Sequence, residues 1–204
     1  MTLQQDAAKR VFDIIVSAIA LVLTSPLLAF IALAICLDSH GRVMFRQARL
    51  GRFMLPFTLF KFRTMIENAP DYRNADGSSF NSANDARVTR LGLFLRRTSL
   101  DELPQLLNVF AGEMSLVGPR PDQVDQSQFY AGEEWRRTLV KPGITGLAQI
   151  SGRNSISWAE RKQMDLEYVA RQSLALDLRI LWRTIPYVIG SHDVFVNQVS
   201  EKVR

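Results

Sequence analysis

The sequence predicts an α+β protein that is mostly helical: a re-entrant membrane helix, followed by a small cytoplasmic domain with amphipathic interfacial helices and a short β-hairpin. Residues 14–37 form an uncharged, mostly apolar run, and a helix needs about 20 such residues to cross a bilayer. The rest of the chain contains short strand-like alternations and amphipathic helical patterns. We therefore expect residues 1–40 to form the membrane helix and residues 41–204 to form one integrated, membrane-associated domain.

Basic residues flank the apolar run on both sides. They are Lys9 and Arg10 before it, and Arg42, Arg46, Arg49 and Arg52 after it. A positive-inside assignment places both ends in the cytoplasm. Ser25 and Pro26 predict a bend, because proline removes a backbone donor, and the Thr24 and Ser25 hydroxyls can donate to the freed carbonyls. A helix that enters, bends and returns fits these features; the alternative is a Pro-kinked spanning helix with a short basic tail.

Composition argues against several other classes of protein. A signal peptide has an apolar region of about 7–15 residues and a small-residue cleavage site, which this run does not show. The formal net charge of +5 accompanies a membrane segment, so it fits anionic lipid headgroups or phosphorylated substrates better than nucleic acid. The lone Cys36 and the widely separated His40 and His192 argue against a disulfide framework, a cysteine or histidine metal site and a Ser-His-Asp triad.

A basic, aromatic segment follows the apolar run. Residues 42–63 carry six basic side chains, five phenylalanines and no acidic residue. Residues 43–45 and 57–62 have the alternation and aromatic content of short strands joined by a turn. Lys61 and Arg63 lie two residues apart, so on a strand they would share a face and converge on one phosphate. The alternative is a solvated basic hairpin lying against lipid headgroups.

The residue types best suited to chemistry gather in residues 96–105. Pro104 is tolerated near a helix start, which predicts a helix that begins close to Asp101. Asp101 and Glu102 would then lie in its first turn, where the helix dipole favours ionised carboxylates, as a nucleophile and a metal ligand require. Adjacent helix positions point roughly 100° apart, unlike a glycosidase pair. The alternative is a helix cap, with Ser99 and Glu102 as a capping box.

Loops and helices downstream supply further candidates. Arg120 lies between two prolines, which suits a rigid guanidinium that binds phosphate, or a structural turn whose arginine pairs with an acid. Ser157 opens an amphipathic helix with a capping-box pattern, on which Asp165 is either a second acid of the site or a solvated residue. Residues 173–190 predict a last helix that lies along the membrane interface. Residues 68–85 predict a loop, whose role the sequence leaves open.

Several of these motifs together resemble one family, the monotopic phosphoglycosyl transferases, also called bacterial sugar transferases, in their short form that consists of the catalytic domain alone. The resemblance covers nearly the whole chain. The motifs are Lys9-Arg10 with Asp13 before the Ser-Pro helix, Phe45-Arg46-Gln47, Lys61-Phe62-Arg63-Thr64-Met65, residues 98–105, residues 114–121 and residues 141–149.

The resemblance implies Mg²⁺-dependent transfer of a sugar-1-phosphate from a UDP-sugar to undecaprenyl phosphate, with release of UMP and a covalent aspartyl intermediate. Asp101 would be the nucleophile and would share the metal with Glu102. Lys61, Arg63, Arg96, Arg120 and Asp165 match positions that the family places around the phosphates and metal. The same resemblance implies a bacterial inner-membrane protein on the cytoplasmic face, in contact with phospholipids. A homodimer stays open as one assembly, because the sequence does not identify the oligomeric state.

Residues 152–154 with Ile156-Ser157-Trp158 are similar to short members that act on N-acetylated amino sugars. Two other functions remain open from the residues alone. One is a membrane-bound phosphohydrolase with the same aspartyl intermediate and water as acceptor. The other is a non-catalytic module that docks on anionic lipid. The sequence does not identify the sugar or the downstream glycan.

Overall fold

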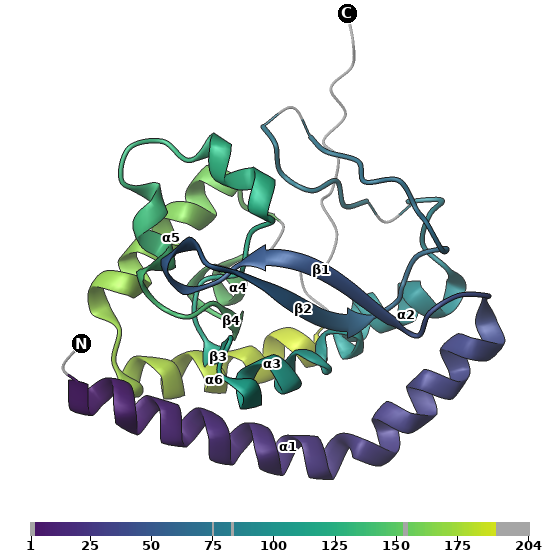
Figure 1. Cartoon of the computed structure of the whole chain (residues 1–204), viewed down its shortest axis with the longest axis horizontal. Coiled ribbons are helices and arrows are strands. Elements are labelled where there is room, and N and C mark those ends of the chain that lie inside the picture. Colours follow the sequence, from purple (N-terminus) through teal and green to yellow (C-terminus); the bar gives the residue numbers. More distant parts are fainter. Residues whose placement is uncertain (1–2, 75, 83, 153–154, 191–204) are drawn as a thin grey trace, which may run out of the picture.

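The computed structural model describes residues 3–74, 76–82, 84–152 and 155–190. The chain is mostly helical, with two small two-stranded sheets, which confirms the helical α+β class (Figure 1). The elements in chain order are α1 (Leu3–Asp38), β1 (Met44–Leu50), η1 (Arg52–Met54), β2 (Pro56–Phe62), α2 (Arg90–Thr98), η2 (Leu100–Glu102), α3 (Gln105–Ala111), β3 (Ser115–Val117), η3 (Val124–Phe129), η4 (Glu134–Leu139), β4 (Gly143–Thr145), α4 (Leu147–Ser151), α5 (Trp158–Arg171) and α6 (Leu174–Ile189).

Helix α1 is one continuous 36-residue helix with Pro26 inside it. Figure 1 shows that it is bent and that the rest of the molecule lies on its concave side. Pro26 has no N–H to donate to the carbonyl of Val22, four residues earlier. The Ser25 hydroxyl donates to this carbonyl instead, at 2.8 Å, and the Thr24 hydroxyl donates to the Ala20 carbonyl at 2.7 Å. The predicted hydroxyl compensation for Pro26 is therefore present.

Polar contacts attach the first turns of α1 to the rest of the molecule. The Lys9 ammonium forms a buried ion pair with Asp177 on α6, at 2.5 Å. The Arg10 guanidinium donates to the carbonyls of Val109 and Phe110, at 2.7 and 2.8 Å. The buried Asp13 carboxylate accepts a hydrogen bond from the backbone N–H of Leu116. These contacts satisfy charged groups that an apolar environment would otherwise penalise.

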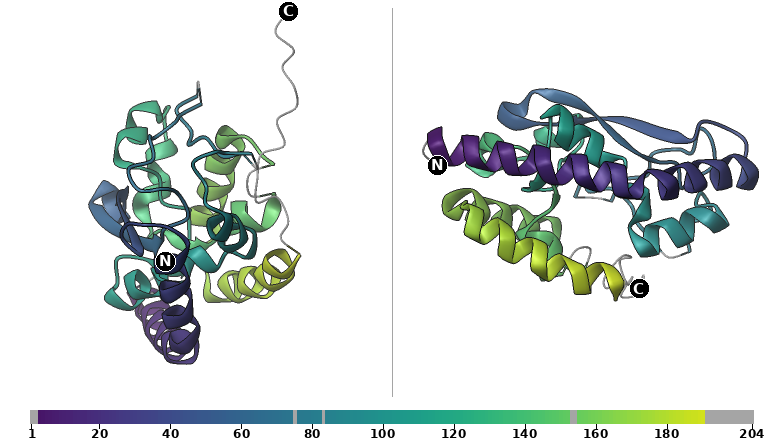
Figure 2. Two further views of the ribbon diagram at one scale, coloured as in Figure 1. Left: turned by 90° about the vertical axis from the view of Figure 1, so that its right-hand side faces the viewer. Right: turned by 90° about the horizontal axis from the view of Figure 1, so that it is seen from below.

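The other side of α1 exposes a long apolar surface. Its exposed large side chains are Val11, Ile15, Ile19, Val22, Leu23, Leu27, Phe30, Leu33 and Leu37. Among the described residues, α1 is the helix that is long and apolar enough to cross a membrane by length and composition. Helix α6 exposes Leu178, Trp182 and Ile185 at helical spacing, and Figure 2 shows α6 next to α1 when the molecule is seen from below.

Strands β1 and β2 form the predicted antiparallel hairpin, in a register that pairs Met44 with Phe62 and Leu50 with Pro56. Both strands are longer than the sequence pattern indicated. The second sheet is a parallel pair of strands, β3 and β4. Just after β3, the backbone of Gly118 closely approaches the backbones of Gly143 and Gly146. A Cβ atom on Gly143 would lie 2.1 Å from the nitrogen of Gly118, and one on Gly146 would lie 2.2 Å from the Gly118 carbonyl oxygen. Only glycine fits at such distances.

The main hydrophobic core lies between the hairpin, α3, the second sheet and helices α5 and α6, and part of α1 packs against it. Val109, Met114 and Val117 are its most deeply buried side chains. A second cluster joins Ile31 and Ile35 of α1 to Phe62 and Leu95. The two clusters fix the hairpin and α2 over α1, and this arrangement positions the residues between α2 and α3.

Candidate active site

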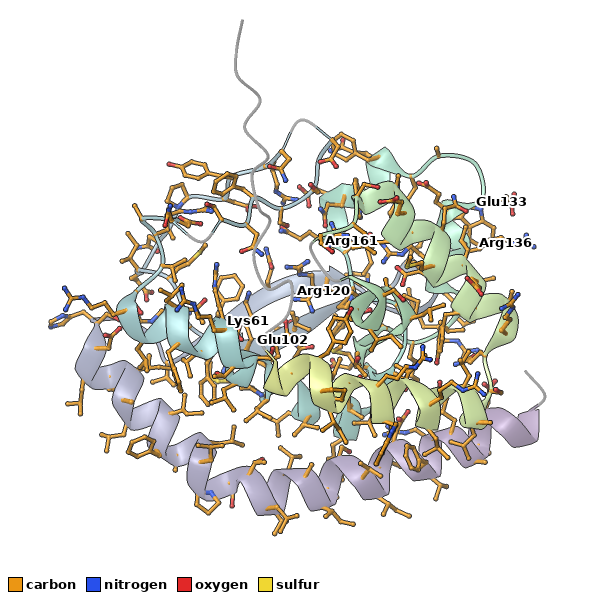
Figure 3. All side chains as sticks on the ribbon, turned by 180° about the vertical axis from the view of Figure 1, so that it is seen from behind. Lys61, Glu102, Arg120, Glu133, Arg136 and Arg161 are labelled. Atoms are coloured by element: carbon orange, nitrogen blue, oxygen red, sulfur yellow. The ribbon has the colours of Figure 1, made fainter. Side chains whose placement is uncertain are left out.

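One cavity of about 480 Å³ gathers most of the polar residues that the sequence singled out. Six of the seven predicted site residues line it: Lys61, Arg96, Asp101, Glu102, Arg120 and Asp165. They come from β2, α2, η2, the segment after β3, and α5. In Figure 3, Lys61, Glu102 and Arg120 lie close together near the centre of the molecule, with Arg161 next to Arg120. The fold therefore assembles residues that are about 100 positions apart in the chain.

Asp101 is buried, with 6% of its surface exposed. It lies with Glu102 in η2, a separate short turn before α3, because α3 begins only at Gln105. Burial raises the pKa of the Asp101 carboxyl to about 6, and the neighbouring Glu102 adds to the increase, while Lys61, Arg96 and Arg120 oppose it. The sequence predicted that the first turn of a helix would favour the ionised carboxylate; Asp101 instead lies in η2, ahead of α3, and burial together with Glu102 raises its pKa.

The predicted alternative for this segment was a capping box made by Ser99 and Glu102. Ser99 adopts a left-handed backbone conformation (φ 57°) between α2 and η2, and its side chain makes no capping hydrogen bond to η2. The two carboxylates instead face the cavity that contains the cations. The site interpretation of Asp101 and Glu102 therefore agrees with the geometry better than the capping interpretation.

Lys61 and Arg96 are the cations that accompany Asp101. Burial lowers the pKa of Lys61 to about 8, against the opposing field of Asp101. Its ammonium lies 5.0 Å from the centre of the Phe45 ring, a cation–π distance. The Arg96 guanidinium donates to the Thr64 hydroxyl at 2.9 Å. Both cations are partly desolvated, which strengthens their attraction for an anionic ligand.

Arg120 forms a two-pronged ion pair with Glu102. Its Nη2 lies 2.6 Å from Glu102 Oε1, and its Nη1 lies 3.3 Å from Oε2. The two interpretations of Arg120 are thus compatible, because the guanidinium both pairs with an acid and lines the cavity. A bound phosphate and a bound metal ion would each compete for one member of this pair.

Arg63 lies away from the cavity. Its guanidinium donates to the Arg42 carbonyl and to the hydroxyl and carbonyl of Ser39, at 2.6, 2.7 and 2.8 Å. Strand β2 ends at Phe62, so the two-residue alternation that should have placed Arg63 beside Lys61 no longer applies. Arg63 instead ties the chain after α1 to the end of β2.

Asp165 is fully enclosed, with 1% of its surface exposed, and is not a solvated helix residue. Its carboxylate pairs with the buried Arg137 guanidinium, which also pairs with Asp122. The Arg137 Nη2 donates to the backbone carbonyl of Arg120 at 2.9 Å. Burial raises the pKa of Asp165, and Arg137 counteracts part of that shift. Through Arg137, Asp165 supports the backbone on which Arg120 is mounted.

The sequence reasoning missed several further residues of the cavity, among them Arg49, Gln149 and Arg161. Arg49 donates to the Pro121 carbonyl at 3.1 Å, and burial followed by the charges of Arg120 and Arg73 lowers its pKa to about 9. Spacing alone does not distinguish Arg49 from the other basic residues of the hairpin. Arg161 precedes Asp165 by four residues on α5, a spacing that places both on one helix face and could have revealed it.

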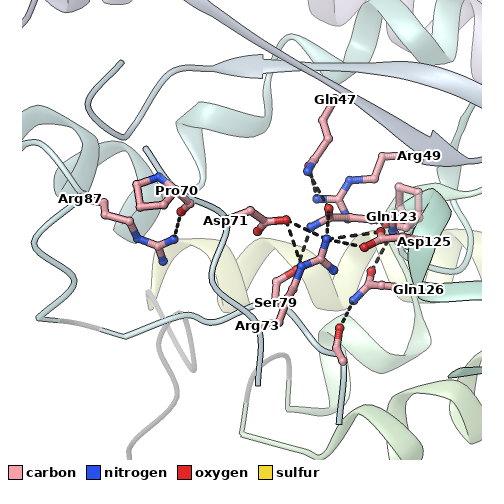
Figure 4. Close-up of polar contacts among 12 residues, drawn as sticks. Gln47, Arg49, Pro70, Asp71, Arg73, Ser79, Arg87, Gln123, Asp125 and Gln126 are labelled. Carbon is pink, nitrogen blue, oxygen red and sulfur yellow. Dashed lines mark hydrogen bonds and ion pairs between the residues drawn. The ribbon is translucent and has the colours of Figure 1, made fainter. Parts of the chain in front are cut away.

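The loop of residues 68–85 supplies one wall of the cavity, through Asn74, Asp76, Ser78, Ser79, Phe80 and Asn81. Figure 4 shows the contacts that fix it. Arg73 donates to Gln123 Oε1 at 2.5 Å and pairs with Asp125 at 3.0 Å. Gln47 of β1 donates to the same Gln123 oxygen at 2.8 Å. The loop is therefore joined to η3 and to the hairpin.

Together these features describe a cavity that places two carboxylates among cations, in a chain with a helix long and apolar enough to cross a membrane. The sequence pattern of the family described as "Bacterial sugar transferase" matches residues 4–191. The chain belongs to this family.

Relatives of known name extend the comparison. The chain is 43% identical over 186 residues to the "Uncharacterized sugar transferase EpsL" of Bacillus subtilis, which covers 91% of this chain and 89% of EpsL. It is 42% identical over 200 residues to the "UDP-glucose:undecaprenyl-phosphate glucose-1-phosphate transferase" of Caulobacter vibrioides (93% and 73%). It is 38% identical over 192 residues to the "Undecaprenyl-phosphate galactose phosphotransferase" of Salmonella typhimurium (89% and 40%).

Proposed function

We propose that this enzyme transfers a sugar-1-phosphate from a UDP-sugar to undecaprenyl phosphate and releases UMP, the first membrane step in assembly of a bacterial glycoconjugate. The observation that carries the proposal is the enclosed Asp101 carboxylate, surrounded by Lys61, Arg96 and Arg120 in one cavity. Such cations neutralise a diphosphate, which otherwise repels an attacking anion. The names of the Caulobacter and Salmonella relatives support the same reaction class.

In the proposed reaction, an oxygen of the Asp101 carboxylate attacks the phosphorus attached to the sugar. The bond from that phosphorus to the oxygen of the α-phosphate breaks, and UMP leaves with the electron pair. The resulting acyl phosphate is then attacked by an oxygen of undecaprenyl phosphate, which releases the Asp101 carboxylate and forms the lipid diphosphate sugar. A carboxylate nucleophile therefore divides the transfer into two steps.

The carboxylates fit a divalent cation that is shared with the substrate. Asp101 and Glu102 are adjacent in η2, and both line the cavity. Mg²⁺ commonly binds through one or two carboxylates together with substrate phosphates and water. We propose that these two residues hold Mg²⁺, which would neutralise the developing phosphate charge.

A panel of UDP-sugars tests the proposal. Each donor, including UDP-glucose, UDP-galactose and UDP-N-acetylated amino sugars, is incubated with undecaprenyl phosphate, and UMP release and sugar label in the lipid phase are measured. UMP release with label in the lipid supports transfer. Free sugar phosphate without lipid label would indicate a phosphohydrolase, and the absence of UMP with every donor would indicate a lipid-binding module. Arg153 and Asn154, which suggested an N-acetylated amino sugar, lie outside the described residues.

The attachment of both ends of α1 supports a re-entrant, monotopic placement at the cytoplasmic face of the inner membrane. Lys9 and Arg10 bind α6 and α3 at one end, and Ser39 binds Arg63 at the other. Contacts of both helix ends with the same domain favour a placement of both ends on one face of the bilayer. The exposed apolar side chains between these ends would contact phospholipid acyl chains.

Cysteine labelling measures this topology. In a Cys36→Ser background, single cysteines introduced by Leu3→Cys and Arg42→Cys should both react with a membrane-impermeant maleimide in inverted vesicles, and neither should react in right-side-out vesicles. Glu133→Cys, on an exposed part of the domain, is the control for the cytoplasmic side. Reaction of positions 3 and 42 from opposite faces would show a spanning helix.

We expect Arg120→Ala to lower turnover by tens to hundreds of fold, a loss of about 2–3 kcal/mol of transition-state stabilisation. The guanidinium that pairs with Glu102 is lost, together with its contact to the transferring phosphate. Arg120→Lys should recover only part of the rate, because an ammonium cannot reproduce a two-pronged contact.

The matched control is Arg136→Ala. Arg136 forms an exposed ion pair with Glu133, and Figure 3 shows both residues far from Arg120. This control should keep its activity. Unchanged turnover in both Arg120 variants would mean that Arg120 serves only to shape the loop.

A further inference from the structure

Gln149, on the short helix α4, has an unusual polar environment. Its amide nitrogen and its amide oxygen are both buried, and neither has a hydrogen-bond partner among the described residues. Most buried polar side-chain atoms in proteins are hydrogen-bonded, and one that is not lowers stability. The side chain lines the cavity that contains Asp101 and Arg120. A ligand in this cavity could therefore supply the hydrogen-bond partner that the Gln149 amide lacks among the described residues.

The Gln149 amide lies close to the backbone of Gly146. A Cβ atom on Gly146 would lie 2.8 Å from Gln149 Oε1, so the side chain folds back against the start of its own helix. Gly146 is in turn close-packed on Gly118, the residue that leads into the Arg120 segment. The amide thus belongs to the same closely packed backbone unit as Arg120.

The chemistry of the amide differs from that of its neighbours. Arg49, Arg96, Arg120 and Arg161 provide charged donors for the phosphates, whereas a primary amide offers one neutral donor group beside one acceptor. Its best partner is a group that presents an acceptor beside an N–H. The imide edge of uracil has this pattern. The trans amide of an N-acetylated sugar holds its N–H and its C=O on opposite sides, so it can make one of the two hydrogen bonds with Gln149 but not both together.

We propose that Gln149 is a specificity residue that recognises a neutral amide or imide group of the donor by hydrogen bonds. The inference rests on the proposed use of a UDP-sugar. It assigns Gln149 to donor binding, separate from the charged groups that hold the phosphates. Because the described residues supply no partner for the buried amide and the donor would supply one, Gln149 should destabilise the ligand-free protein while it strengthens donor binding.

Gln149→Leu separates these two effects, since leucine fills a similar volume without polar atoms. We expect the melting temperature of the ligand-free variant in detergent to rise by about 2–4 °C, because the unpartnered amide is gone. We expect the KM for the donor to rise roughly 10- to 100-fold, with a smaller change in kcat. Gln149→Glu, which keeps the acceptor oxygens but loses the donor, should also weaken donor binding.

Calorimetric titration with UMP identifies the part of the donor that is recognised, without requiring turnover. Weaker UMP binding to Gln149→Leu places the amide on uracil. Unchanged UMP binding, with a lost preference between UDP-N-acetylglucosamine and UDP-glucose, places it on the sugar. The control is Gln163→Leu, the same substitution at an exposed position of α5, which should alter none of these values.

The proposal is overturned if Gln149→Leu changes neither UMP affinity, donor KM nor selectivity. This outcome is distinct from failure of the proposed function itself, in which the native protein would bind no UMP and would release none from any UDP-sugar.

Discussion

Asp101→Asn should abolish turnover, with a loss of at least about 10⁴-fold, because asparagine keeps the shape of the side chain but cannot attack phosphorus. The native enzyme incubated with UDP-sugar alone should release about one UMP per active site. It should also gain the mass of a sugar phosphate on the peptide that contains Asp101. Both signals should be absent from the variant, as measured by a nucleotide assay and by mass spectrometry.

Glu102→Gln is the neighbouring control. This variant loses the Glu102 carboxylate but keeps Asp101, the proposed nucleophile. Excess Mg²⁺ should therefore recover part of the turnover. If no adduct can be trapped in the native enzyme, and steady-state kinetics require donor and acceptor to be bound together, then transfer is direct and the covalent step is wrong.

The same Asp101→Asn variant should be more stable than the native protein at pH 7. The pKa of Asp101 rises from 3.8 to about 6 on folding, so the folded state holds an unfavourable ionised carboxylate above that value. The penalty is absent below pH 4, develops between about pH 4 and 6, and is complete at pH 7, where it is on the order of 3 kcal/mol. Thermal unfolding at pH 4 and pH 7 measures the difference; equal stability gains at both pH values would contradict this origin.

Lys9→Met should destabilise the protein by about 3–5 kcal/mol, because it leaves the Asp177 carboxylate buried without its cation. Asp177 is wholly enclosed and also accepts a hydrogen bond from Tyr168 at 2.7 Å. For a chain of this size the midpoint of thermal unfolding should fall by roughly 6–20 °C. The measurement is differential scanning fluorimetry in detergent, with activity assayed below the transition.

Adding Asp177→Asn to Lys9→Met should restore much of the lost stability, since the uncompensated charge is then gone. Arg171→Met is the matched control, because Arg171 forms an exposed ion pair with Glu167 and such pairs contribute about 0–1 kcal/mol. A loss for Lys9→Met no larger than that of this control would show that the buried pair is not important for attaching α1 to α6.

Features encoded in short stretches of sequence were predictable. The apolar run gives α1, the alternation of β1 and β2 gives the hairpin, and the capping box of Ser157 and Glu160 opens α5 as expected. These patterns depend on neighbouring residues and on local backbone geometry. The gathering of Asp101, Lys61 and Arg120 came instead from the family resemblance, since no local rule brings such distant positions together.

Features that depend on where a segment ends or on what covers it were not predictable. Arg63 was misplaced because β2 stops one residue earlier. The environment of Asp101 was expected to favour the ionised carboxylate, but burial by segments distant in sequence raises its pKa. Gln149 carries no signal in its own neighbourhood, because its unpartnered state is a property of the folded cavity.

The close contact of Gly118 with Gly143 and Gly146 has a consequence for how mutations would distribute over the gene. A comprehensive substitution library selected for glycan production should show these glycines as intolerant of change as Asp101 itself, although glycine has no side chain with which to react. A Cβ atom at position 143 would meet the Gly118 nitrogen at 2.1 Å and displace the backbone that carries Arg120. Intolerance at these positions would therefore reflect the close packing of the backbone. A map of tolerated substitutions alone would not distinguish the residues that take part in the reaction from the glycines that this packing requires.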